Sequence, residues 1–209
     1  MVPDTSKAPL ATPEQILVAA TRLFAAGGYG GTSLQEVADA VGIRKQSLLY
    51  HFPSKDALRR RVLDMLLSRW NDVLPRLLLA ATSGEGQFDA VVAETIRFFA
   101  EDPDRARLLL REILDRPADV QGMVGTHIAP WVEVVSGYIR KGIERGDIPP
   151  DVDPQAYVLG VMHLILSAVA TGECFGRVAD RGRQIAEVLR IAKSSLFRTR
   201  AGATPQQRD

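Results

Sequence analysis

The strongest constraint on the fold of this chain is a series of helix start and stop signals that repeats along the sequence. Residues 12–15 (TPEQ) combine an N-cap threonine, a proline at the first helical position and a glutamine placed to complete a capping box. Residues 33–36 (SLQE) carry a second box, and Gly27-Gly28 and Gly42 are helix-ending glycines. No segment sustains the apolar–polar alternation typical of strands. The sequence therefore predicts an all-α fold.

Apolar spacing and caps together predict about nine helices. They lie at residues 12–27, 33–41, 45–52, from 55 towards Pro75, and then at 86–101, 103–115, 118–145, 153–173 and 179–198. Pro103, Pro117 and Pro154 stand where helices should begin, whereas Pro130 falls inside the seventh helix. Because proline removes one backbone hydrogen bond and clashes with the preceding turn, we expect a kink there.

The second and third predicted helices, joined by a glycine-containing turn, form a helix-turn-helix pattern. In this motif the later helix enters the major groove, where its N-terminal residues face base edges. Thr32 and Ser33 offer hydroxyl and backbone N–H groups to a phosphate, and Lys55 offers an ammonium. Small three-helix units that do not bind DNA also show this pattern. The side chains available for base edges, with arginine and lysine suited to guanine and glutamine to adenine, are Arg44, Lys45, Gln46, Ser47 and Tyr50.

The distribution of charge points to the same end of the chain. The net charge is only +1, yet residues 42–61 contain six basic side chains against one acidic side chain, Asp56. Such local asymmetry is a reason to expect a polyanionic partner. A solvated helix face is the alternative, above all for Arg59, Arg60 and Arg61, for which direct DNA contact is the other interpretation.

The run from Ile16 to Leu63 resembles the N-terminal DNA-binding domain of TetR-type transcriptional regulators. The family's pieces occur in order: GYGGTS at residues 28–33, VADAVG at 37–42 and LLYHFPSKDAL at 48–58. The resemblance implies an all-helical, two-domain homodimer that binds operator DNA and usually releases it when a small molecule enters the C-terminal domain. On this basis we expect a flexible arm at residues 1–10, the helix-turn-helix domain at 11–55, a helical ligand-binding and dimerisation domain at 56–199, and a flexible tail at 200–209.

The resemblance also assigns roles to single residues. Thr32 and Ser33 become phosphate contacts of the second helix, and His51 and Lys55 become contacts to the DNA backbone. The base-reading or groove-lining candidates are Arg44, Lys45, Gln46, Ser47 and Tyr50. Three residues depart from the family's pattern: Arg44 replaces a small capping residue, Gln46 replaces Gly, Ala or Pro, and Leu49 replaces a tyrosine that reaches a phosphate. These departures leave the domain assignment intact and the recognised DNA sequence open.

The C-terminal part contains aromatic and apolar residues at helical spacing, which are candidates for a ligand cavity between helices. Ordinary core packing is the alternative for each of them. Their composition favours a hydrophobic or aromatic ligand over a sugar phosphate. The candidates are Trp70, Phe98, Phe99, Met123, His127, Trp131, Met162, His163 and Leu166.

The last two predicted helices are the expected dimer surface, as part of a four-helix bundle, with burial inside one subunit as the alternative. Residues 154–172 carry no charged side chain and are long enough to span a membrane. They lack basic anchors before them, so we expect a buried helix and no membrane partner. An apolar stripe and a set of small residues mark these helices: Ile185, Val188, Leu189, Ala192 and Leu196, and Gly160, Ser167, Ala168 and Ala170.

The expected function is therefore a homodimeric repressor in the cytoplasm, released from a near-palindromic operator by a small, mostly apolar ligand. A ligand-dependent activator, a co-repressed regulator and a helical small-molecule carrier without DNA binding are the alternatives. With histidines only at 51, 127 and 163, and with Cys174 as the single cysteine, no catalytic motif, metal site or cofactor motif is evident. The lone cysteine cannot form an intramolecular disulfide, which fits a reducing compartment.

Overall fold

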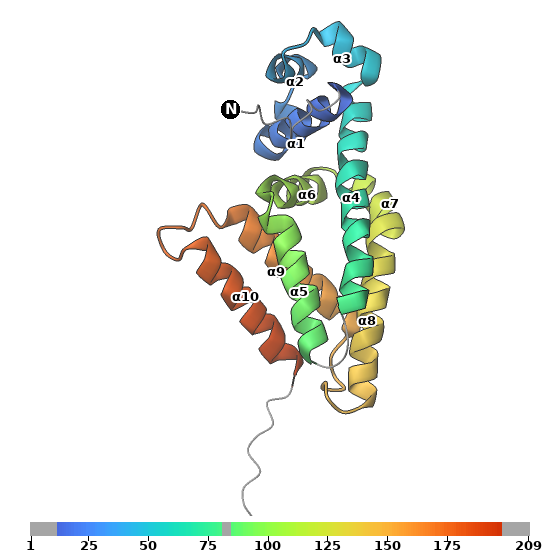
Figure 1. Cartoon of the computed structure of the whole chain (residues 1–209), viewed down its shortest axis with the longest axis vertical. Coiled ribbons are helices and arrows are strands. Elements are labelled where there is room, and N and C mark those ends of the chain that lie inside the picture. The colour runs from blue at the N-terminus through green and yellow to red at the C-terminus, as the bar shows by residue number, and fades with distance from the viewer. Residues whose placement is uncertain (1–11, 81–84, 198–209) are drawn as a thin grey trace, which may run out of the picture.

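The computed structural model describes residues 12–80 and 85–197, and this part of the chain is helical and contains no strand (Figure 1). The arm and the tail expected at residues 1–10 and 200–209 lie outside the described residues. The elements are α1 (Thr12–Gly31), α2 (Leu34–Val41), α3 (Lys45–His51), α4 (Lys55–Ala80), α5 (Glu85–Ala100), α6 (Pro103–Asp115), α7 (Pro117–Met123), a π-helical turn (Val124–Ile128), α8 (Ala129–Glu144), α9 (Pro154–Thr171) and α10 (Arg181–Leu196).

The all-α prediction is confirmed, and the helix boundaries differ from expectation at three places. α1 does not end at Gly27-Gly28 but bends at Gly28, which has φ 72° and ψ 172°, and resumes to Gly31. α4 runs through Pro75 to Ala80, because a proline can kink a helix without ending it. The helix predicted at 118–145 is divided by the π-helical turn directly before Pro130, where the missing N–H disturbs the hydrogen-bond ladder.

The molecule consists of a small head and a larger body, which α4 connects (Figure 1). The head contains α1, α2, α3 and the start of α4 around a core that includes Ile16, Phe24 and Leu48. The body contains α5, α8, α9, α10 and the rest of α4, around a second core that includes Trp70 and Ile165. α6 lies between the two, and its Leu108 belongs to the core of the head. The core of the head also includes Leu58, Val62 and Leu63 of α4, which lie beyond the expected boundary at residue 55. The domain boundaries 11–55 and 56–199 stay a prediction.

The apolar stripe of α10, expected on a dimer surface, packs instead into the body of its own chain. Ala192 and Leu196 are fully buried, and the other stripe residues, Ile185, Val188 and Leu189, are partly buried against the same core. This is the alternative of burial within one subunit. The physical reason is that α10 covers α5 and α9, whose inner faces would otherwise remain exposed to water.

α9 behaves differently. It is long and apolar enough to cross a membrane by length and composition alone, with a mean hydropathy of 1.4, yet only 28% of this helix is buried. Leu159 and Leu164 are about two-fifths exposed, and Gly160 and Ser167 are exposed beside them. The outer face of α9 therefore presents apolar side chains to solvent.

Candidate nucleic-acid interface and ligand cavities

The turn before α2 is held by the capping box expected from the sequence. Ser33 Oγ accepts a hydrogen bond from the backbone N–H of Glu36 at 3.1 Å, and the backbone N–H of Ser33 donates to Glu36 Oε2 at 2.6 Å. These bonds to Ser33 lower the pKa of the Glu36 carboxyl below its ordinary value of 4.5. Gly42 ends the helix with a left-handed conformation, φ 76°. The cap fixes where α2 starts, and Gly42 fixes the angle at which the chain enters α3.

α3 presents its polar N-terminal face to solvent because its apolar face is anchored in the head. Leu48 is fully buried and Phe52, at the C-cap, is 8% exposed, whereas Leu49 is half-buried. Arg44 occupies the N-cap in an extended conformation, and its side chain makes no capping hydrogen bond, so its guanidinium is available for another partner. The predicted groove-facing residues are all exposed: Arg44, Lys45, Gln46, Ser47 and Tyr50, the last with 86% of its side chain accessible.

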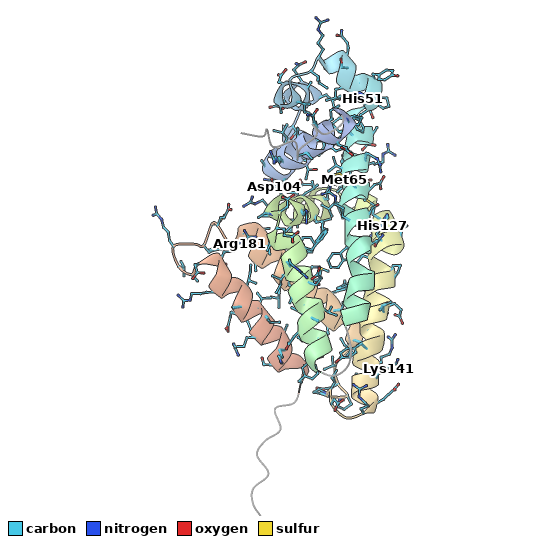
Figure 2. The ribbon with its side chains drawn as sticks, in the orientation of Figure 1. His51, Met65, Asp104, His127, Lys141 and Arg181 are labelled. Carbon is cyan, nitrogen blue, oxygen red and sulfur yellow. The ribbon has the colours of Figure 1, made fainter. Side chains whose placement is uncertain are left out.

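The other predicted DNA contacts have more varied surroundings. Thr32 is buried, and its hydroxyl donates to the carbonyl oxygens of Gly28 and Leu23 at 2.9 and 3.1 Å. Ser33 is exposed, but its hydroxyl serves the cap of α2. His51 is exposed at the end of α3, close to the start of α4, with its ring edge-on to Tyr50 at 5.4 Å between centroids (Figure 2). The Thr32 hydroxyl proton is thus used within the protein, whereas the Ser33 hydroxyl only accepts in the cap and keeps its proton for another acceptor. His51 is accessible.

Lys55 lies at the junction between head and body. Its ammonium is 4.3 Å from the ring centroid of Tyr29, and the guanidinium of Arg116 lies on the same ring at 4.6 Å. The Tyr29 ring also packs against Phe24, with 6.1 Å between ring centroids. Cations near an aromatic ring are attracted by its quadrupole. Lys55 remains partly exposed in this position.

Sequence reasoning missed the junction cluster, which we define as Arg59, Arg111, Glu112 and Asp119. Arg59 is 2% exposed, so it belongs neither to a solvated face nor to a DNA contact; the two interpretations of this residue are both wrong. Its guanidinium binds Glu112 at 2.9 Å and Asp119 at 3.0 Å. The neighbouring Arg111 donates to the carbonyl oxygens of Ala25 and Ala26, both at 2.8 Å. The partners of Arg59 lie more than fifty residues away along the chain, so local spacing gave no signal for this cluster.

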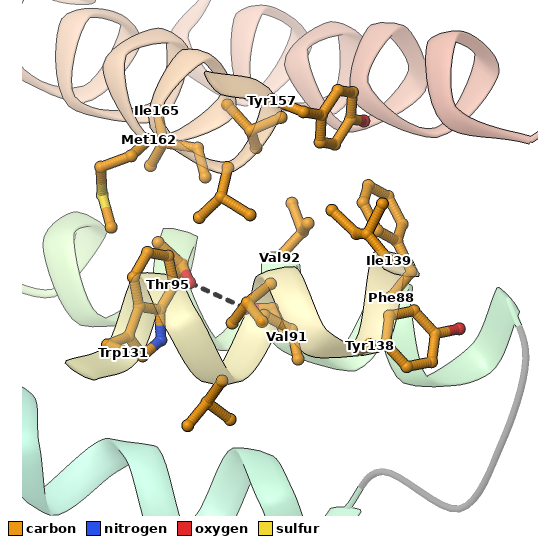
Figure 3. Close-up of a pocket in the computed structure, with 14 residues that line it drawn as sticks. Phe88, Val91, Val92, Thr95, Trp131, Tyr138, Ile139, Tyr157, Met162 and Ile165 are labelled. Carbon is orange, nitrogen blue, oxygen red and sulfur yellow. Dashed lines mark hydrogen bonds between the residues drawn. The ribbon is translucent and has the colours of Figure 1, made fainter. Parts of the chain in front are cut away.

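The body contains a cavity, cavity A, of about 60 Å³ between α5, α8 and α9 (Figure 3). Its wall is almost entirely apolar, and the predicted ligand residues Trp131 and Met162 belong to it. Tyr157 closes one end, with its hydroxyl donating to the carbonyl oxygen of Ala192. The remaining lining residues are Phe88, Val91, Val92, Thr95, Val134, Val135, Tyr138, Ile139, Val158, Val161 and Ile165.

A second cavity, cavity B, of about 130 Å³ lies between α4, α6, α7 and α9. It is also apolar, and Glu112 of the junction cluster forms part of its wall. The structure brings together here six of the predicted ligand residues: Trp70, Phe99, Met123, Met162, His163 and Leu166. The other lining residues are Leu63, Leu66, Leu67, Leu109, Ile113, Val120, Ile128 and Leu159.

Two predicted ligand residues line neither cavity. Phe98 packs against Trp70 at 5.2 Å between ring centroids, with the guanidinium of Arg105 over its other side. His127 lies beside α4, with Nδ1 3.3 Å from the side-chain nitrogen of Asn71 (Figure 2). Phe98 is therefore a core residue, which is the alternative given for each ligand candidate. Among the described residues, no cluster of histidine, cysteine and carboxylate side chains is arranged to hold a metal ion.

Comparison with known proteins agrees with this architecture. Residues 16–62 match the sequence model of the family described as "Bacterial regulatory proteins, tetR family". The chain is 31% identical over 154 residues to the HTH-type transcriptional regulator RutR of Escherichia coli K12, covering 72% of this chain and 70% of RutR. It is 35% identical over 164 residues to the HTH-type transcriptional repressor KstR2 of Mycolicibacterium smegmatis, covering 73% and 75%. A solved tetR-family structure from Rhodococcus RHA1 superposes with a TM-score of 0.74 at 20% identity, covering 90% of this chain and 97% of that one.

Proposed function

Because this chain belongs to the tetR family of bacterial regulatory proteins, we propose that it is a homodimeric repressor that leaves its operator when a small apolar effector occupies the body. It is a DNA-binding transcriptional regulator that acts in the cytoplasm, and it has no catalytic role. The observation that supports this most directly is the geometry of α3. Leu48 anchors the helix inward, while Arg44, Lys45 and Tyr50 stand free on its outer face.

Some of these groups would position the protein on the DNA backbone, and others would read the base sequence. His51 and the backbone at the start of α2 would contact phosphates, which supply affinity and salt sensitivity. Arg44 and Lys45 are suited to the acceptors of guanine, and Gln46 to adenine. Ser47 and Tyr50 complete the face that would lie in the major groove. Because the Thr32 hydroxyl is used internally, any phosphate contact at that position would come from the backbone.

Dimerisation would use the outer face of α9 together with α10. A helix as apolar as α9 that remains mostly unburied in one chain is best covered by a second copy. Gly160 and Ser167 allow close approach of a partner helix, and Ile191 of α10 is exposed on the neighbouring helix. A two-fold dimer would present two copies of α3 to successive major grooves about 34–36 Å apart, or at a stretched version of that spacing. The operator should therefore be nearly palindromic.

The effector would act by favouring a dimer whose two heads have the wrong spacing for DNA. It can shift this equilibrium only by the difference between its affinities for the two forms. Cavity B is the better candidate for its site, because it is the larger cavity and touches both α4 and α6, which connect head and body.

The decisive experiment is selection of bound DNA from a random pool with the full-length protein. We expect enrichment of one near-palindromic sequence, with tighter binding at low salt. Enrichment of a single half-site would contradict the dimer, and absence of any enriched sequence would favour a carrier without DNA binding.

A further inference from the structure

We propose that Glu112 makes cavity B selective for a compact ring compound that carries one hydrogen-bond donor, an N–H or a hydroxyl group, and that this donor binds Oε1 of the Glu112 carboxylate. The proposal rests on the function proposed above and names the chemical class of the effector. Three features of the described structure support it: the size of the cavity, its apolar wall and the unequal use of the two carboxylate oxygens.

The size and the wall of cavity B fit a single ring system. Its volume of about 130 Å³ is close to that of an engineered apolar cavity of roughly 150 Å³ that binds benzene. Leu109 and Ile113 of α6 flank Glu112 on the same wall, and Met123 and Leu166 add apolar surface from α7 and α9. An apolar ring therefore gains free energy simply by leaving water for this space.

The two oxygens of the Glu112 carboxylate have different surroundings. Oε2 lies 2.9 Å from both Nε and Nη2 of Arg59. None of the hydrogen bonds among the described residues engages Oε1, although the whole residue is only 3% exposed. Oε1 is not among the described side-chain atoms that are fully buried without a partner, so water can reach it, and Glu112 lines cavity B. A donor on a bound ring would take the place of that water at Oε1.

Charge balance indicates which kind of donor this is. Arg59 pairs with Glu112 at close range, while Arg116 and Arg60 pair with Asp119 and Asp56, the other carboxylates that Arg59 contacts. A further full positive charge would therefore have to be buried without a charge of its own to pair with. A neutral N–H or hydroxyl keeps the balance and still forms a hydrogen bond to a charged acceptor. Of the other polar side chains of the wall, His163 is exposed and Trp70 carries only a donor, so Glu112 is the buried charged acceptor among the described lining residues.

Indole and indene test this selectivity with the full-length protein and without DNA. The two molecules share a ring skeleton, but indole carries an N–H where indene carries a CH₂. By calorimetric titration we expect indole to bind about tenfold more tightly, since a hydrogen bond to a charged group is worth about that factor. Equal affinities for indole and indene would overturn the proposal, whatever any variant shows.

Glu112→Gln tests the residue itself. The amide has one acceptor oxygen, which Arg59 would occupy, so the NH₂ group would face the cavity and oppose the indole N–H. We expect the preference for indole to fall to about twofold or less. A preference that survives in a folded Glu112→Gln protein would contradict the role of Glu112.

Two matched substitutions locate the site. Val120→Trp fills cavity B from α7, and Val134→Trp fills cavity A from α8. We expect Val120→Trp to lose indole binding and Val134→Trp to retain it, and the reverse result would overturn the proposal. Because none of these measurements uses DNA, a failed operator selection with an intact indole preference would reject the regulatory function alone. An intact operator with no indole preference would reject only the role of Glu112.

Discussion

Arg59 of α4 donates from Nε to Oε2 of Glu112 in α6 at 2.9 Å, and both side chains are more than nine-tenths buried. This pair joins the helix that leaves the head to the helix that lies between head and body. Next to Glu112, Arg111 holds the carbonyl oxygens of Ala25 and Ala26 in α1. Two consecutive residues of α6 therefore bind two different helices of the head. A displacement of α6 would alter its hydrogen bonds to both helices.

Replacing Arg59 tests the buried pair. Arg59→Ala should lower the free energy of unfolding by about 3–5 kcal/mol, because it leaves the Glu112 carboxylate buried without its partner. Arg60→Ala is the matched control: Arg60 is exposed and pairs with Asp56 at the surface, so its removal should cost less than about 1 kcal/mol. Urea denaturation measures both. Similar losses for the two variants would mean that the buried Arg59–Glu112 pair contributes no more to the free energy of unfolding than a surface pair does.

The bend in α1 depends on glycine at one position. Gly28 has φ 72° and ψ 172°, a conformation that residues with a Cβ adopt only under strain, and a Cβ there would lie 3.3 Å from Nη1 of Arg111. We expect Gly28→Ala to lower the free energy of unfolding by about 1–3 kcal/mol. Gly30→Ala, where a Cβ meets no described atom within 4 Å, should be neutral or stabilise by up to about 1 kcal/mol. Thermal unfolding compares the two variants. A Gly28→Ala protein that is more stable than the Gly30→Ala protein would contradict the expected strain at Gly28.

The outer face of α9 is tested by introducing a charge. Leu164 is 42% exposed on this face, and Leu164→Glu should give a folded monomer, since burying an unpaired carboxylate in an interface is strongly unfavourable. Leu114→Glu is the control, because Leu114 is even more exposed but lies on α6, outside the proposed interface. Sedimentation analysis gives the oligomeric state. A dimeric Leu164→Glu protein would rule out this face.

Tyr50 allows DNA binding to be separated from folding. Its side chain is so exposed that Tyr50→Ala should change the free energy of unfolding by no more than about 0.5 kcal/mol. Operator binding, in contrast, should be lost, because Tyr50 stands on the face of α3 that would enter the groove. Val178→Ala, equally exposed between α9 and α10, should bind DNA as the parent protein does. Unchanged affinity and sequence preference of Tyr50→Ala in gel shifts would remove Tyr50 from the recognition surface.

The capping box predicts a pH dependence at the start of α2. Hydrogen bonds from Ser33 depress the pKa of Glu36 below 4.5, so the folded state prefers the ionised carboxylate. A depressed carboxyl pKa gives a stabilisation that is complete above the unfolded-state pKa and is lost as the pH falls through the lower folded-state value. Side-chain NMR titration should therefore report a pKa for Glu36 below its ordinary value, and Ser33→Ala should return it towards that value. A normal pKa in the parent protein would contradict the reciprocal cap.

Local signals were reliable where a few neighbouring residues decide the structure. The Ser33–Glu36 box, the stop at Gly42 and the inward position of Leu48 all follow from spacing and cap chemistry, and each is present. The same logic fails for Arg59, which lies in a basic run and was expected at the surface. Its partners Glu112 and Asp119 are more than fifty residues away, and spacing along the chain carries no information about such contacts.

Sequence alone thus determined the helices, their caps, the two-domain order and the exposed polar face of α3, because backbone hydrogen bonds and apolar periodicity are properties of short segments. Only the tertiary structure decided which apolar residues enclose space and which fill it: Met123 and Leu166 line cavity B, whereas Phe98 is packed against Trp70. It also decided that α10 turns its stripe inward while α9 keeps an apolar face outside. Burial depends on which helices pack against each other, and that packing is set by contacts between segments that are distant in the sequence.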